Sequence, residues 1–324
     1  MKKEKSWLGR FISGLGIGTG AAIPGVSGAA VALIFGVYEA IINAVDGFTK
    51  HVKKSLATLF PILLGVGLAV ILCIIVFHWA FEHVMFILIC LFVGFLIGSF
   101  PSILNEVKFA PVTKKNIIIA AIGALIVISL GVLSVILGNH GVNFASYFVN
   151  SESFFGNWWL IIVLFFVGIL ASVALTVPGF SGSLVLLILG FYRPLIDSAS
   201  TWGKEIFKGE FVNTGALIVM IFVFAIGCLV GVVCISKIMT KLLKNHHDAT
   251  YFAIIGFIIG SFFVLFFNYQ IYQYYQVWGG QTIEGINPSL SPAYEIPLGI
   301  LMIGLFGFFS YMIVRAQNNL KSKE

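Results

Sequence analysis

Six apolar stretches, each about 20 residues long, constrain this chain more than any other feature. They lie at about 56–77, 83–104, 116–137, 214–236, 250–267 and 294–314. A helix rises about 1.5 Å per residue, so about 20 residues cross a hydrocarbon core of roughly 30 Å. A helix also satisfies its own backbone groups in lipid, and none of these stretches alternates like a barrel strand. The sequence therefore predicts an all-α polytopic membrane protein with six full spans.

Two further apolar segments, 9–46 and 158–200, are interrupted in the middle. The first contains PGVSG and the second contains PGFSG. Proline removes a backbone donor and glycine loosens a helix, so each segment should form two half-helices that meet at a non-helical elbow. We favour re-entrant hairpins because the first arm, 8–23, is short and rich in glycine. A pair of thin full spans remains the alternative, since both arrangements return the chain to the same side.

The elbows belong to an internal repeat. Residues 24–38 align without gaps on residues 178–192, an offset of 154, and GFLIGSF from Gly94 matches GFIIGSF from Gly256, an offset of 162. Two matches in the same order indicate a duplication. We predict a first repeat at 1–150 and a second at 151–324, each made of one broken hairpin and three transmembrane helices.

The parity of the spans and the distribution of charge predict the topology. A hairpin returns to its starting side and three spans do not, so the second repeat should be inverted relative to the first. With the N-terminus inside, 16 of the 19 Lys and Arg residues fall in cytoplasmic segments, and only Arg193, Lys204 and Lys208 fall outside. The net charge of +6 therefore reflects topology rather than nucleic-acid binding. We expect a multi-pass membrane protein with both termini in the cytoplasm.

The two elbows have the chemistry of an anion site. Ser27 and Ser181 stand where an N-cap would start the second half-helix, and the neighbouring glycines let a ligand approach the backbone. Free N–H groups and the helix dipole would then face the elbow. The alternative is a helix break with close packing and no ligand. The candidate substrate-binding residues at the elbows are Pro24, Gly25, Val26, Ser27, Gly28, Pro178, Gly179, Phe180, Ser181, Gly182 and Ser183.

Glu39 and Arg193 follow the two elbow serines at the same distance, twelve residues on. One interpretation is that both side chains only reach toward the membrane surface. The functional interpretation is that Arg193 binds a phosphate from the outer side, because a forked guanidinium fits phosphate, while Glu39 is a protonatable coupling or gating group. We include both as candidate functional residues.

Several classes of activity lack support in the sequence. There is no G-x-x-x-x-G-K-[ST] motif for ATP and no H-E-x-x-H motif for zinc, so we expect no cofactor and no metal. A lipid phosphatase would need a nucleophile with a base, and no histidine is close to either elbow in the sequence. We expect a transporter rather than an enzyme. A channel or transporter for a small anion is the first alternative, and a lipid phosphatase is the second.

At these residues the chain resembles a bacterial membrane family, the polyprenyl-phosphate transporters (PopT), once described as a domain of unknown function. The resemblance rests on PGVSG followed by GVYE at 36–39, and on PGFSG-S followed by GFYR at 190–193. It covers roughly residues 10 to 270. It implies a flippase that returns undecaprenyl phosphate, the lipid carrier of cell-wall precursors, from the outer to the inner leaflet.

Inward movement of an anion opposes an inside-negative membrane potential. The cost is about 2.3 kcal/mol per charge for each 100 mV. We therefore expect a coupled cation, H⁺ or Na⁺, with Glu39 the first candidate to carry a proton.

Overall fold

The computed structural model describes residues 6–23, 31–32, 34–46, 52–107, 112–139, 147–148, 150–172, 185–186, 189–283 and 285–321. Nearly all of these residues are helical. The helices are α1 (Trp7–Ala22), α3 (Tyr38–Asp46), α4 (Val52–His83), α5 (Met85–Glu106), α6 (Lys114–Asn139), α7 (Ser151–Gly156), α8 (Trp159–Ala171), α11 (Tyr192–Phe207), α12 (Thr214–Asn245), α13 (His247–Phe266), α14 (Tyr269–Trp278) and α15 (Pro292–Lys321). Across these described residues the only β-type pairing is an isolated bridge between Ile283 and Ile286.

Six helical segments are long and apolar enough to cross a membrane, which confirms the predicted polytopic all-α fold. They are Val52–His83, Met85–Asn105, Lys114–Leu133, Thr214–Val232, His247–Trp278 and Pro292–Ala316. Each overlaps one of the six apolar stretches of the sequence. The first arm of the second hairpin, α8, is shorter, at Trp159–Ala171.

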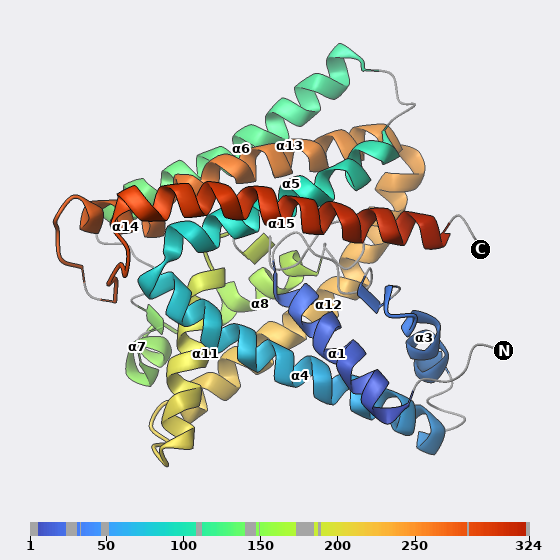
Figure 1. Cartoon of the computed structure of the whole chain (residues 1–324), viewed down its shortest axis with the longest axis horizontal. Helices are drawn as coiled ribbons and strands as arrows, with labels where there is room; N and C mark the ends of the chain where they lie inside the picture. The colour runs from blue at the N-terminus through green and yellow to red at the C-terminus, as the bar shows by residue number, and fades with distance from the viewer. Residues whose placement is uncertain are drawn as a thin grey trace.

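The long helices form two groups (Figure 1). Helices α15, α5, α13 and α6 pack in that order as one layer. Outside this layer, α1 packs along α4 and α8 packs along α12, so the first arm of each hairpin lies against the first span that follows it. The second arm of the second hairpin continues into α11, which packs against α4 of the first half.

Glycines allow the two hairpin arms to approach their spans closely. On α1 and α4, a Cβ added at Gly14 would overlap the carbonyl oxygen of Ile62, and one added at Gly65 would overlap the carbonyl oxygen of Phe11. Small residues at such crossings let membrane helices pack backbone to backbone. The crossing fixes where α1, and its last residue Ala22, lies relative to α4.

The second half repeats this crossing. A Cβ at Gly168 of α8 would overlap the carbonyl oxygen of Phe224 on α12, and one at Gly227 would overlap that of Phe165. These residues follow Gly14, Ile62, Gly65 and Phe11 by the same offsets of 154 and 162 that the sequence motifs show. The matched crossings support the duplication, while the opposite orientation of the two halves in a membrane stays a prediction.

In each hairpin, a helix ends with the same glycine motif just before the next helix begins. Gly36 and Gly190 have positive φ angles of 61° and 77°. The N–H of Val37 donates to the carbonyl of Ala32, as the N–H of Phe191 does to Leu186. This six-to-one bond across a left-handed glycine is a Schellman motif, which ends one helix and redirects the chain into the next. It sets the start of α3 and of α11.

One span continues further than the sequence predicted. The stretch 250–267 corresponds to α13, but after a break the chain re-enters a helix, α14. The side chain of Asn268 starts α14 by accepting hydrogen bonds from the N–H groups of Gln270 and Ile271, at 3.0 and 3.2 Å. Three glutamines within α14 interrupt its apolar character, so hydropathy alone ended the span too early.

Candidate functional site

The first elbow begins where the sequence placed it. Helix α1 ends at Ala22, and the capping residue Ile23 is extended, with φ −82° and ψ 124°. The residue before a proline is disfavoured in the α region, so Pro24 accounts for this end. The elbow residues Pro24 to Gly28 and Pro178 to Ser183 themselves lie outside the described residues. Their predicted role in binding stays a prediction.

A hydrogen bond joins the two hairpins beside the first elbow. The hydroxyl of Tyr192, the first residue of α11, donates to the carbonyl oxygen of Ala22 at 2.8 Å. Ala22 and Ile23 from the first hairpin and Leu186 from the second also pack against the same buried cluster. Segments about 170 residues apart in the sequence therefore meet at the end of α1.

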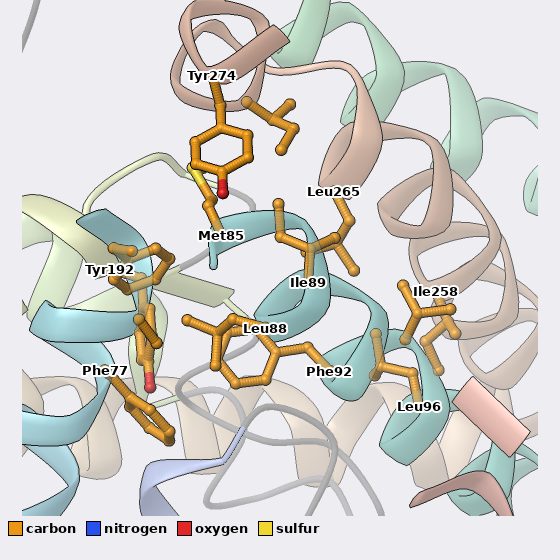
Figure 2. Packing of buried hydrophobic residues seen from close by; sticks show 14 of the residues in the cluster. Phe77, Met85, Leu88, Ile89, Phe92, Leu96, Tyr192, Ile258, Leu265 and Tyr274 are labelled. Atoms are coloured by element: carbon orange, nitrogen blue, oxygen red, sulfur yellow. The ribbon is translucent and has the colours of Figure 1, made fainter. Parts of the chain in front are cut away.

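Aromatic packing fixes the start of α11 (Figure 2). The ring of Tyr192 makes edge contacts with Phe81 and Phe92, at centroid distances of 6.1 and 5.9 Å, and a tilted contact with Phe77 at 6.4 Å. Tyr192 itself is 5% exposed. Helices α4, α5 and α11 are thus held together by aromatic rings at this point. The next residue along α11 is Arg193.

Arg193 lies inside the protein rather than reaching to its surface, since its side chain is only 11% exposed. Its Nε donates to Oδ2 of Asp197 at 3.2 Å. Nη1 lies 3.8 Å from the sulfur of Met85, and Nη2 lies 3.4 Å from the carbonyl oxygen of Gly285. The guanidinium also lies 5.6 Å from the ring centre of Phe81, within range of a cation–π interaction. The predicted phosphate ligand is therefore a largely enclosed cation.

Asp197 links Arg193 to a histidine on another helix. The Nδ1 atom of His78, on α4, lies 2.9 Å from Oδ1 of Asp197. The side chains of His78 and Asp197 are 22% and 31% exposed. The three residues form a chain of charge-assisted contacts between α4 and α11.

A loop positions the third partner of Arg193. The N–H of Asn287 donates to the carbonyl of Glu82 at 2.9 Å, and the N–H of Ser289 donates to that of His83 at 2.8 Å. These bonds hold the loop between α14 and α15 against the turn from α4 to α5. The carbonyl of Gly285 is thereby brought to Arg193.

The partners of Arg193 come from three different segments. Met85 begins α5, Asp197 lies on α11, and Gly285 lies in the loop between α14 and α15. The expectation that Arg193 lies on the outer side of the membrane stays a prediction. Glu39 is the repeat equivalent of Arg193 and lies on α3, but its side chain is outside the described residues.

Sequence reasoning missed Asp197 and His78 as parts of this site. Asp197 could have been found, because it lies four residues after Arg193 on an expected helix, where side chains meet. His78 could not, because it is 119 residues away from Asp197 in the sequence. Only the packing of α11 on α4 brings them together.

Comparison with known proteins decides the family. The family model described as VCA0040-like, undecaprenyl phosphate translocase-like, matches residues 17–282. The chain belongs to the undecaprenyl phosphate translocase-like family. The match confirms the resemblance recognised from the two elbow motifs.

Two relatives of this undecaprenyl phosphate translocase-like chain are both named polyprenyl-phosphate transporter. The one from Staphylococcus aureus is 32% identical over 268 residues, which cover 82% of this chain and 87% of the relative. The one from Vibrio cholerae serotype O1 is 22% identical over 276 residues, covering 80% and 77%. No solved structure matches the chain. The transporter names agree with the expectation that the chain is not an enzyme.

Proposed function

We propose that this protein transports undecaprenyl phosphate from the outer to the inner leaflet of the bacterial plasma membrane, so that the carrier is reused for cell-wall precursors. Family membership and the names of the two relatives support a polyprenyl phosphate as the substrate. The observation that carries the proposal is the enclosed Arg193, one residue from the contact where the two hairpins meet. The predicted orientation, with both termini in the cytoplasm, places Arg193 toward the outer leaflet.

The chemistry of the lipid fits this arrangement. Its isoprenoid tail can stay in the hydrocarbon, so only the phosphate needs a polar path across the membrane. A guanidinium offers five N–H donors in a planar fork that matches phosphate oxygens. We propose that Arg193 binds the phosphate from the outer side and that free N–H groups at the two elbows receive it within the membrane.

Cation coupling is part of the proposal. Moving a negative charge inward costs about 2.3 kcal/mol for each 100 mV of inside-negative potential, and entry of H⁺ or Na⁺ would offset it. Glu39 is the candidate proton carrier because it corresponds to Arg193 in the other half. Flux in proteoliposomes should increase when a pH or Na⁺ gradient is imposed, and flux that ignores both gradients would contradict the coupling.

Head-group selectivity tests the substrate. Purified protein in lipid nanodiscs should bind undecaprenyl phosphate and should bind undecaprenol, which lacks the phosphate, much more weakly. The matched variant Arg193→Lys keeps the charge but loses the fork, so the Kd for undecaprenyl phosphate should rise about tenfold. Equal binding of the two lipids would remove the phosphate from the mechanism.

The same assay addresses the small-anion alternative. Inorganic phosphate and chloride at millimolar concentration should not displace bound undecaprenyl phosphate. Displacement by either ion, together with ion flux through liposomes that contain the protein, would instead support a small-anion transporter.

A further inference from the structure

Arg193 already has an anionic partner in this structure, Asp197, but Asp197 contacts only part of the guanidinium group. Asp197 contacts a single nitrogen, Nε, at 3.2 Å. The two terminal nitrogens face the Met85 sulfur at 3.8 Å and the Gly285 carbonyl at 3.4 Å. A thioether is a weak acceptor, and strong N–H···O bonds are about 2.7–3.2 Å long. Among the described residues, the two terminal nitrogens of the fork therefore have only weak partners.

His78 explains why Asp197 does not form a bidentate pair with Arg193. One carboxylate oxygen, Oδ2, contacts Arg193, while the other, Oδ1, contacts His78 at 2.9 Å. The carboxylate is thus divided between two helices, α11 and α4. Its hold on Arg193 is correspondingly incomplete.

The stability of α11 gives little reason for an acidic residue at position 197. In the first turn of a helix, an acidic side chain interacts favourably with the helix dipole. Asp197 is the sixth residue of α11 and lies beyond that turn. Its order relative to Arg193, with the base on the N-terminal side, is also the less favourable one for a helical pair. Helix stability alone does not account for a partly buried carboxylate at this place.

We propose that Asp197 is the resident counter-anion of Arg193, which the lipid phosphate displaces on binding and which returns when the lipid leaves. This inference rests on the proposed function of Arg193. An enclosed cation without a partner is costly in the empty state, and a phosphate held by it without competition would be slow to leave. Asp197 provides a partner for the empty state and competes with the phosphate. His78 positions Asp197 for this exchange.

Binding and turnover measured together test the proposal. In Asp197→Asn, which has nearly the same shape without the charge, the Kd for undecaprenyl phosphate in nanodiscs should fall about tenfold. The kcat for flux in proteoliposomes should fall as well, because release becomes slower, so KM and kcat should decrease together. Asp197→Glu, which restores the charge, should recover both values toward those of the wild type.

Two further variants complete the test. In an Arg193→Gln background, Asp197→Asn should no longer tighten binding, since the competition acts through Arg193. His78→Leu frees the second carboxylate oxygen of Asp197 for Arg193, so the Kd for undecaprenyl phosphate should rise several-fold. This change is opposite in sign to that of Asp197→Asn, and it can be measured even if Asp197→Asn does not fold. Unchanged or weaker binding by folded Asp197→Asn, equal tightening in both backgrounds, or unchanged binding by His78→Leu would each overturn the proposal.

The proposed function fails in a different way. Arg193→Gln with wild-type affinity for undecaprenyl phosphate would remove Arg193 from the substrate site. Weaker binding by Arg193→Gln combined with unaltered binding by Asp197→Asn would leave the proposed function in place and would reject only the role of Asp197.

Discussion

Replacing Glu295 by alanine is expected to lower the free energy of unfolding by about 3–5 kcal/mol, a large fraction of the total for many proteins. Glu295 lies on α15 and is fully buried. Its Oε1 accepts from the N–H groups of Phe86 and Ile87 at 3.2 and 3.4 Å, and its Oε2 accepts from the Tyr274 hydroxyl at 2.9 Å. The helix α5 has no side-chain cap of its own. Glu295 therefore caps α5 from a neighbouring helix.

Removal of this carboxylate would leave the N–H groups of Phe86 and Ile87 without their acceptor in a buried place, and the Tyr274 hydroxyl would keep only the carbonyl oxygen of His83, at 3.1 Å. Thermal or denaturant unfolding in detergent measures the loss. Glu295→Gln is the matched control, since it keeps one carbonyl oxygen as acceptor and should cost only about 1 kcal/mol. An alanine variant as stable as the glutamine variant would show that the cap contributes nothing.

Alanine at Gly65 and alanine at Gly67 should change stability in opposite directions. Gly65 is buried where α4 crosses α1, and an added Cβ would overlap the Phe11 carbonyl oxygen and lie 2.8 Å from the Leu15 nitrogen. Such overpacking costs about 1–3 kcal/mol, because the helices must separate. Gly67 is exposed on the same helix with nothing within 4 Å. There, alanine should stabilise by about 0.5–1 kcal/mol through its higher helix propensity.

The Gly65 change should also impair transport. Helix α1 ends at the first elbow, and the hydrogen bond from Tyr192 reaches its last residue, Ala22. Displacing α1 therefore moves the junction of the two hairpins. Unfolding and flux should be measured on both variants, and only Gly65→Ala should lower both. Equal stability of the two variants would contradict the close crossing of α1 and α4.

Local sequence information predicted the fold well because the bilayer limits the available structures. Apolar length located all six spans. The matching glycine crossings at Gly14 and Gly168 depend on how each hairpin arm packs on its span, which apolar length does not specify. The ends of the spans were less accurate: α4 runs from Val52 to His83, well beyond the predicted 56–77. Polar residues inside its last turns, such as His78, lower the hydropathy without ending the helix.

The candidate site was predicted only in part, for a physical reason. Arg193 was identified because the repeat aligned it with Glu39, which needs only sequence. Its partners depend on the folded structure. Asp197 is placed by the helix register of α11, and His78 is placed by the contact of α11 with α4. The carbonyl of Gly285 is placed by a loop that Glu82 and His83 hold. Glu295 was also missed, because a carboxylate at the start of an apolar stretch is expected near the membrane surface.

Leaflet-specific flux tests the central claim most directly. Undecaprenyl phosphate is added to the outer leaflet of proteoliposomes, and the fraction that becomes protected from an external, membrane-impermeant phosphatase is followed in time. Wild-type protein should make the lipid protected much faster than protein-free liposomes do, and folded Arg193→Gln should reduce the rate nearly to that of the protein-free liposomes. A wild-type rate equal to that of protein-free liposomes, or an undiminished rate in Arg193→Gln, would contradict transport through this site.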